Sequence, residues 1–288
     1  MKKIPISILI IMFNEEKNIR STFENVSEKF EQIVVVDSGS LDKSLEICAE
    51  FKDVEVFQSP KNGFSDKMNW ALANVNFKCD WIFRLDADET ITPKLFGLLE
   101  QMFSNNEIIH DSIGYYVLRK YYFMNKWIKF GTMYPVKTLR LWRKNKASCE
   151  SRLLDEHMLV EGKVSDVSAA IEDRNQLSLS QWVMKHMNYA LLEKKVIELS
   201  QNDFSQPTGD LLSDHQDKKR RWIKENIYYR MPLFFRAFIY YFYRYIIRFG
   251  FLDGKAGLVY HFLHGFWYRF MVDSLIYEEQ IIKKRGEK

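Results

Sequence analysis

The first 90 residues alternate short apolar runs with stretches of helical spacing, and this alternation constrains the fold more than any other feature. Four runs, rich in β-branched and aliphatic residues, cover 6–13, 33–36, 54–57 and 81–85. Runs of this length and composition are typical of strands buried on both faces. Between them, apolar side chains recur every three to four residues, as in amphipathic helices. The βαβαβαβ order predicts an α/β fold whose parallel sheet carries helices on both faces.

Polar side chains follow three of these runs directly. Asn14 and Glu15 come after the first run, Asp37 ends the second, and Asp86 and Asp88 come after the fourth. In open α/β sheets, ligands bind beyond the carboxyl ends of the strands. We therefore expect these side chains to converge on one crevice.

The charge of the 288-residue chain is concentrated near its C-terminus. Residues 218–288 contain 15 Lys/Arg and 6 Asp/Glu, although the whole chain carries a formal charge of only +4. Residues 222–270 also contain 19 aromatic side chains. Trp, Tyr and basic residues favour an anionic membrane surface. The alternatives are that this segment packs on the body or forms a dimer interface. No RNA-binding motif accompanies it, so we expect no nucleic-acid partner.

These shifts in composition predict three parts: a catalytic domain over 1–200, a linker over 201–217 and a helical, membrane-associating extension over 218–288. No secretory signal and no run of 18 uncharged apolar residues is visible. We therefore expect a cytoplasmic protein that is peripheral on the inner face of the cell membrane. The pattern leaves the oligomeric state open.

The cysteines argue against a zinc site or a disulfide framework. They are three in number, widely spaced and without a CxxC pair, which predicts reduced thiols. They are Cys48, Cys79 and Cys149.

The pair Asp86 and Asp88 is a candidate metal site. Two carboxylates at the end of a strand can bind one divalent cation, Mn²⁺ or Mg²⁺, that shares its remaining ligands with substrate phosphates. Such a cation would neutralise a diphosphate leaving group. The alternative is a pair of solvated loop aspartates, and the position after a buried strand favours the metal. Lys67 and Arg143 are candidate contacts to the diphosphate.

Asp37 ends a buried strand, where its carboxylate can accept a hydrogen bond from a nucleotide base. The alternative is an N-cap for the helix expected from Leu41. Ser40 suits that cap better, which leaves Asp37 free for a ligand.

Asp155, Glu156 and His157 stand in a polar stretch, 150–162, that we expect to be a loop near the site. A carboxylate there can act as the general base that deprotonates an acceptor hydroxyl. The alternative is a charged surface loop.

Several stretches resemble glycosyltransferase family 2, an inverting family with the GT-A fold. They are ISILIIMFNEEKNI, VVVDSGSLDKS, GFSDKMNWAL and WIFRLDADE, and they stand in the order and spacing of that family. Three later stretches are similar to a bacterial subgroup that assembles lipopolysaccharide core and surface polysaccharide. They are LRLWRKNKA, RLLDEHMLVEG and FGFLDGKAGLVYHFL.

The resemblance implies a role for each candidate residue. Phe13, Asn14, Glu15 and Asp37 would surround uracil or another base, and Lys67 would lie near the base or the phosphates. Asp86 would contact the ribose and the metal, and Asp88 would bind the metal. Glu156 would be the catalytic base. The subgroup often has His-Glu there, and because Asp155 precedes Glu156 in this chain, Asp155 is the alternative base.

The resemblance also implies the activity, which is transfer of a sugar from a nucleotide-sugar donor, typically a UDP-sugar, to a lipid-linked or lipopolysaccharide-core glycan. One rival is a haloacid-dehalogenase-type phosphatase with Asp86 as nucleophile, because residues 86–90 fit DxDxT and residues 209–214 fit GDxxxD. That class opens with DxDxT on its first strand, whereas three strands precede it here. A nicotinamide enzyme is disfavoured because no GxGxxG follows a strand. A non-catalytic membrane scaffold is the remaining alternative.

Overall fold

The computed structural model describes residues 3–104, 112–202 and 216–286. The linker expected over 201–217 lies almost wholly outside the described residues, as does the GDxxxD stretch.

Two compact units make up the chain. The first comprises residues 1–127 and 135–176, and the second comprises residues 128–134 and 177–288. A short segment of the middle of the chain thus belongs to the C-terminal unit.

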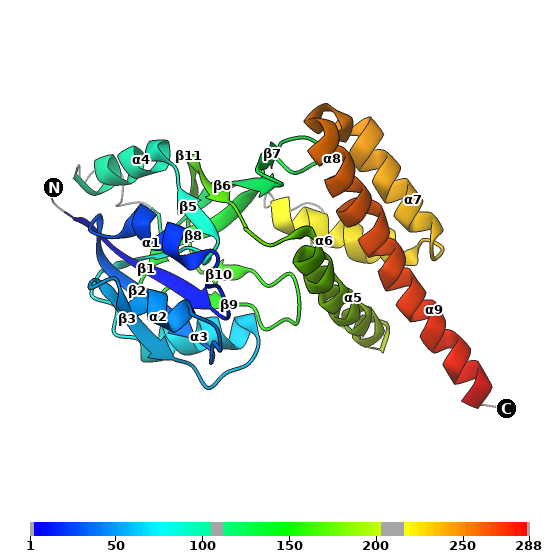
Figure 1. Ribbon diagram of the computed structural model, residues 1–288, viewed down its shortest axis with the longest axis horizontal. Helices are drawn as coiled ribbons and strands as arrows, with labels where there is room; N and C mark the ends of the chain where they lie inside the picture. Colours follow the sequence, from blue (N-terminus) through cyan, green and yellow to red (C-terminus); the bar gives the residue numbers. More distant parts are fainter. Residues whose placement is uncertain (1–2, 105–111, 203–215, 287–288) are drawn as a thin grey trace. The chain divides into compact units, whose positions relative to one another are not determined.

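The first unit is built on a mixed β-sheet (Figure 1). Its strands are β1 (Ile4–Met12), β2 (Phe30–Asp37), β3 (Val54–Gln58), β4 (Trp81–Arg84), β5 (Glu89–Ile91), β6 (Gly114–Phe123), β7 (Lys126–Ile128), β8 (Lys137–Arg143) and β11 (Val164–Asp173). Among the described residues their order is β3-β2-β1-β4-β8-β6-β11-β5, with β7 paired to β6.

The half of the sheet formed by β1 to β4 is parallel, as the alternation predicts. The other half is mixed, because β8 runs antiparallel to both β4 and β6, while β11 is parallel to β6. β2 and β4 flank β1 on opposite sides. The sheet is thus extended from β1 in one direction by β2 and β3 and in the other direction by β4, which makes the edge between β1 and β4 a topological switch point. A crevice for a ligand is expected at such a switch point, beyond the carboxyl ends of β1 and β4.

Helices cover both faces of this sheet (Figure 1). They are α1 (Ile19–Val26), α2 (Ser44–Ala49), α3 (Phe64–Asn74) and α4 (Pro93–Ser104). Helices α1, α2 and α4 pack on one face. On the other face lie α3 and a hairpin of β9 (Ala147–Cys149) and β10 (Met158–Val160). The polar stretch expected to be a loop over 150–162 therefore includes a short strand, β10, and is a loop before it and a bend after it.

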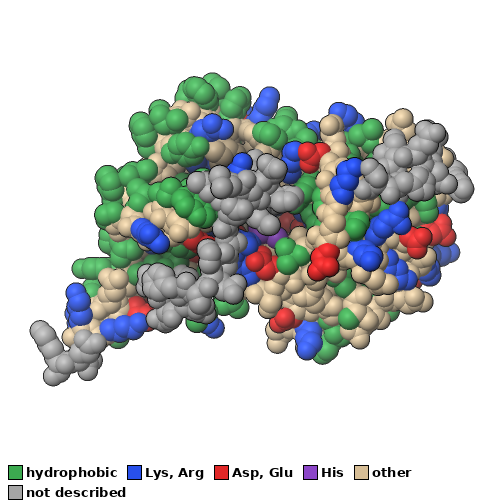
Figure 2. All heavy atoms as spheres, turned by 180° about the vertical axis from the view of Figure 1, so that it is seen from behind, with side chains coloured by type: hydrophobic (Ala, Val, Ile, Leu, Met, Phe, Trp, Pro, Cys, Tyr) green, Lys and Arg blue, Asp and Glu red, His purple; other side chains and the backbone are tan. Residues whose placement is uncertain are grey.

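The second unit is helical. Its helices are α5 (Leu179–Asn202), α6 (Gln216–Asn226), α7 (Phe235–Phe242), α8 (Gly254–Tyr260) and α9 (Tyr268–Gly286). The connections include 3₁₀ turns at Tyr228–Arg230 and Gly250–Asp253 and π-helical turns at Tyr243–Ile247 and His261–Trp267. Hydrophobic side chains are spread widely over the surface of this unit (Figure 2). In the part of the chain that the structure describes, no helix is both long and apolar enough to cross a membrane.

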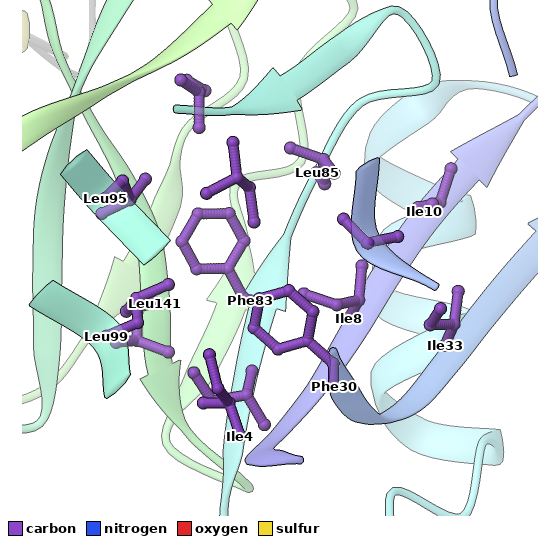
Figure 3. Packing of buried hydrophobic residues seen from close by; sticks show 14 of the residues in the cluster. Ile4, Ile8, Ile10, Phe30, Ile33, Phe83, Leu85, Leu95, Leu99 and Leu141 are labelled. Carbon is purple, nitrogen blue, oxygen red and sulfur yellow. The ribbon is translucent and has the colours of Figure 1, made fainter. Parts of the chain in front are cut away.

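The core of the first unit lies between the sheet and its helices (Figure 3). Side chains of β1 alternate between the two faces, so Ile8 and Ile10 pack toward α1 and α4 while Leu9 packs toward α3. Phe83 of β4 is fully buried beside them. The three cysteines are buried free thiols. The α/β class and the C-terminal helical extension expected from the sequence are confirmed.

Candidate active site

Asp86 lies just beyond β4, at the edge of the sheet that the sequence predicts. Arg84 Nε donates to its Oδ1 at 2.9 Å, and Arg140 Nη2 donates to its Oδ2 at 3.2 Å. Burial opposes ionisation of Asp86, but Arg140 and Arg84 together hold the pKa of this carboxyl well below its usual range. Asp86 is therefore an ionised carboxylate whose two oxygens both face guanidinium groups.

A buried ion pair between Arg140 and Glu89 lies next to Asp86 and is hydrogen-bonded to it. Arg140 and Glu89 are 2% and 1% exposed, and Arg140 Nη2 lies 2.6 Å from Glu89 Oε1. Glu89 Oε2 also accepts the backbone N–H of Asp86 at 2.9 Å. Burial raises the pKa of Glu89 to about 7 although Arg140 lowers it. Glu89 was not predicted from the sequence, where the available signal was its place directly after the Asp86–Asp88 pair.

Asp88 joins the end of β4 to the end of β11. Asn175 Nδ2 donates to Asp88 Oδ2 at 2.6 Å, and the N–H of Arg174 donates to the Asp88 carbonyl at 2.9 Å. The charge of Asp88 acts on Asp173, whose pKa burial and the neighbouring carboxylates raise well above its ordinary value. The pairing of β11 is remote in sequence, so no local pattern predicted Asp173 or Asn175 as part of this site.

The loop after β1 is fastened to the loop after β2. The N–H of Asn14 donates to Ser40 Oγ, and the N–H of Leu41 donates to Asn14 Oδ1, each at 2.8 Å. Asn14 has a positive φ of 55°, a conformation that asparagine tolerates better than most residues. The N–H of Glu15 donates to Ser44 Oγ. Phe13, which precedes Asn14 in this fastened loop, has an exposed ring.

Asp37 is fully buried rather than free, which corrects the expectation from the sequence. Its Oδ2 accepts the N–H groups of Gly39 and Ser40, and its Oδ1 accepts the hydroxyl of Ser40. A short aspartate turn of this kind shapes the backbone that follows the strand. The following helix, α2, begins at Ser44, later than expected.

Lys67 of α3 lies near both Phe13 and Asp37. Its Nζ is 5.5 Å from the centre of the Phe13 ring. Burial lowers the pKa of Lys67, while the charge of Asp37 raises it. The structure therefore brings Phe13, Asn14, Glu15, Asp37 and Lys67 together at the ends of β1 and β2.

Arg143 does not join this group. It pairs with Trp81, the first residue of β4, and its guanidinium lies over the Trp81 ring. The carboxylates lie beyond the other end of β4. The arginine of β8 that reaches them is Arg140, because β8 runs antiparallel to β4 and places its earlier residues at the carboxyl end of β4.

Glu156 stands in the loop between β9 and β10. Burial raises its pKa, and the charges of Arg84 and Asp86 act on it from the end of β4. Asp155 is exposed and has a positive φ of 57°. The start of this loop is tied to α3, since Ser65 Oγ donates to the Glu150 carbonyl at 2.7 Å. Of the two candidate bases, Glu156 is the one held in a partly buried environment.

The donor set suits a divalent cation that takes most of its ligands from a substrate. Within the described residues there is no group of three His, Cys, Asp or Glu side chains able to enclose a metal. Asp86 has both oxygens bound to arginines, so Asp88 is the carboxylate better placed to reach a cation. One or two carboxylates completed by phosphate oxygens and water are a common way of binding Mg²⁺.

Comparison with known proteins identifies the family. The model of glycosyl transferase family 2 matches residues 7–152, which is half of the chain and includes β1 to β4 and both aspartates after β4. Lipopolysaccharide core biosynthesis glycosyltransferase LpsC of Rhizobium meliloti is 26% identical over 197 residues, covering 66% of this chain and 71% of LpsC.

Other relatives match over shorter stretches. Minor teichoic acid biosynthesis protein GgaA of Bacillus subtilis is 26% identical, covering 37% of this chain and 26% of GgaA. An uncharacterized glycosyltransferase of Rickettsia bellii is 33% identical, covering 35% of this chain and 33% of the relative. The chain thus spans only about a quarter to a third of these two proteins.

Among solved structures, S. aureus TarS 1–349 in complex with UDP-GlcNAc has a TM-score of 0.44 and 14% identity, covering 97% of this chain and 92% of that one. The parallel, helix-flanked strands and the helical extension of the present structure fit the GT-A fold expected from the resemblance. The chain belongs to glycosyl transferase family 2, and is a glycosyltransferase rather than a phosphatase.

Proposed function

We propose that the chain transfers one sugar from a nucleotide-sugar donor, a UDP-sugar, to a hydroxyl of a lipid-linked or lipopolysaccharide-core glycan, with inversion at the anomeric carbon. The observation that carries the proposal is the set of side chains beyond the carboxyl ends of β1, β2 and β4. An exposed aromatic ring and a half-buried lysine lie at the ends of β1 and β2, and two aspartates and a partly buried glutamate lie at the end of β4.

The donor nucleotide lies at the ends of β1 and β2 in this proposal. Phe13 offers its exposed ring to the base, and the backbone of Asn14 and Glu15 borders it. Asp37 holds the adjoining turn through its bonds to Gly39 and Ser40 and so shapes the backbone that borders the base. Lys67 extends from α3 toward the phosphates, where its charge would attract them.

The diphosphate lies at the end of β4. A cation, Mn²⁺ or Mg²⁺, bound by Asp88 and bordered by Asp86 would stabilise the charge of the leaving group. Arg140 adds positive charge beside Asp86, and among the described residues its buried Nη1 has no hydrogen-bond partner. We propose Arg140 in place of Arg143 as the arginine of this site.

Glu156 acts as the general base. It takes the proton of the acceptor hydroxyl while that oxygen forms its bond to the anomeric carbon, and the bond from this carbon to the diphosphate oxygen breaks. The products are a glycan longer by one sugar and a nucleoside diphosphate. A single displacement of this kind inverts the configuration and forms no glycosyl-enzyme intermediate. Asp155 is the alternative base.

The composition of the second unit supports our proposal for the acceptor class. We propose that residues 218–288 rest on the inner face of the cell membrane, which would keep the enzyme beside a lipid-linked glycan. The basic, aromatic composition of this segment supports the proposal.

The proposal is tested by donor turnover in Asp88→Ala, with Asp80→Ala as the matched control because Asp80 is an exposed aspartate at the opposite end of β4. Asp88→Ala should lower manganese-dependent UDP-sugar turnover by about 100-fold, since a cation contributes several kcal/mol to a transition state of this kind. UDP should also raise the melting temperature of the native chain only with manganese present. Full turnover in Asp88→Ala would contradict the metal role, and release of phosphate from a monoester without sugar transfer would contradict the transferase.

A further inference from the structure

The turn that joins α7 to α8 in the helical unit is covered with exposed apolar side chains. We call residues 246–258 the tip. Phe249, Phe251 and Leu252 are 56%, 43% and 54% exposed, although side chains of this size are usually buried. Ile246, Ile247 and Leu258 are exposed beside them.

A stripe of exposed apolar side chains lies along α7, the helix that precedes the tip in the sequence. Phe235, Phe238 and Phe242 follow the i, i+3, i+7 spacing of one helix face, and each is more than half exposed. The surface view shows hydrophobic side chains gathered over the helical unit (Figure 2). An exposed apolar surface this continuous marks an interaction site.

The exposed charged side chains of the tip itself, residues 246–258, are positive. Arg248 and Lys255 are exposed on the tip itself, and Lys129 is exposed on the segment bonded to it. The only carboxylate between Glu225 and Asp273 in the sequence is Asp253, which is 3% exposed. A partner of this surface must therefore be apolar and must tolerate or prefer cations.

Buried hydrogen bonds hold the base of the tip in one conformation. Asp253 accepts the N–H groups of Lys129 and Phe130 at 3.1 and 3.0 Å. The N–H of Gly131 donates to the carbonyl of Arg248 at 2.9 Å, and Arg244 Nε donates to the carbonyl of Gly131 at 2.9 Å. The segment 128–134 is thus fastened under the tip.

The backbone of the tip is strained at Phe249, and burial of the Phe249 side chain does not compensate for this strain. Phe249 has φ 59°, an unusual conformation for a bulky residue, yet its ring is mostly in water. Strain of this kind persists where the surrounding structure imposes it, and it is often found at functional positions. The tip is therefore a preformed projection that presents aromatic side chains to the outside.

We propose that the tip is a membrane-insertion element that enters the headgroup and acyl boundary of an anionic bilayer, with Phe249, Phe251 and Leu252 in the apolar layer and Arg248, Lys255 and Lys129 at the phosphates. This deepens the membrane contact of the proposed function and rests on it. Amphipathic surfaces bind membranes through buried apolar area and attraction to anionic lipids together, and the tip supplies both.

The test is co-sedimentation of the full chain with two kinds of vesicle. Neutral vesicles contain phosphatidylcholine alone, and anionic vesicles contain phosphatidylcholine with about 30% phosphatidylglycerol. Phe251→Ser/Leu252→Ser should weaken partitioning at least about tenfold on both kinds of vesicle, because apolar area no longer leaves water. Arg248→Gln/Lys255→Gln should weaken it about 25-fold on anionic vesicles, which is about fivefold for each cation, and little on neutral ones.

Two control variants outside residues 218–288 match these in type and exposure. Leu191→Ser/Leu199→Ser removes two α5 leucines that are 50% and 52% exposed, and Lys52→Gln/Lys195→Gln removes two exposed cations. Both controls should partition like the native chain. Equal loss in tip and control variants would overturn the proposal, as would a native chain that does not sediment with anionic vesicles. A concentration-dependent dimer that the tip variants convert to monomer would also overturn it, in favour of a second copy as the partner.

Turnover of UDP-sugar in the absence of vesicles separates this inference from the proposed activity. The tip variants should keep native donor turnover, since the tip is remote in sequence from every residue proposed to bind the donor. If the tip variants kept both native donor turnover and native vesicle binding, only the membrane-insertion proposal would be refuted. If the native chain bound vesicles but turned over no donor, only the proposed transferase activity would be refuted.

Discussion

At the scale of single residues, the environment of Glu156 sets the pH at which it can accept a proton. Burial raises its pKa, with Asp155 and Asp86 adding to the rise and Arg84 opposing it. A base works only when ionised, so transfer should fall as the pH drops through this raised pKa. We expect the acid limb of the kcat profile to lie above the ordinary glutamate value of about 4.3.

Glu156→Gln should lower kcat by a factor of about 10² to 10⁴ and leave the KM for the donor almost unchanged. Asp155→Asn is the matched control, and it should keep both the rate and the acid limb. The measurement is the pH dependence of transfer in the three proteins. If Asp155→Asn abolished transfer while Glu156→Gln preserved it, the base would be Asp155.

The Arg140–Glu89 pair makes a separate prediction about stability. Arg140→Met leaves the buried Glu89 without its partner and should lower the free energy of unfolding of the first unit by about 3–5 kcal/mol. The double variant Arg140→Met/Glu89→Leu removes both charges and should recover much of this loss. The stability of both variants is measured by urea unfolding that is monitored through hydrogen exchange of the β4 and β8 amides. A double variant as unstable as the single one would show that the pair itself stabilises the fold.

Residues near the site differ in how far the sequence could place them. Asp86 and Asp88 follow a buried strand, and this local pattern was enough to place them beyond the carboxyl end of β4. Choosing between Arg140 and Arg143 required the pairing of β8 with β4, which joins segments about 60 residues apart. The two arginines look equivalent in the sequence, and only the register distinguishes them.

At the scale of elements, the segment 128–134 and the π-helical turn His261–Trp267 that follows α8 depend on each other through a close packing contact. A Cβ added to Gly131 would lie 2.1 Å from Cε1 of His261, and Gly131 also has φ +63°. Gly131→Ala should therefore destabilise the helical unit by about 2–4 kcal/mol, from backbone strain and overpacking together.

Gly265→Ala is the control in the same unit. Gly265 stands in a helical turn, and the nearest atoms to an added Cβ are those of Tyr241 at 3.8 Å, an ordinary contact. Alanine there should leave stability unchanged or raise it by up to about 1 kcal/mol. Hydrogen exchange of the α7 and α8 amides reports the local free energy of opening. A Gly131→Ala chain with native protection would contradict the close contact.

At the scale of the whole molecule, two units have different kinds of polar surface. The first unit collects carboxylates and arginines at the end of β4, while the second buries some of its ion pairs and exposes many apolar side chains. Arg236 and Asp273 form one such buried pair, and Glu193 is another buried carboxylate, bonded to Tyr268, Tyr229 and Arg269. The C-terminal charge seen in the sequence is thus divided among buried pairs, the cations at the tip and further exposed cations on α6 and α9.

The sequence by itself determined the parallel half of the sheet and the position of the aspartates after β4. Hydrophobic periodicity and the residue at a strand end are local properties, so a single stretch of chain is enough to express them. The tertiary structure alone decided the antiparallel strand β8, the hydrogen bonds that occupy Asp37, the Arg140–Glu89 pair and the support of the tip by residues 128–134. Each of these depends on which distant segments pair and in which register, and no local pattern of side chains encodes that choice.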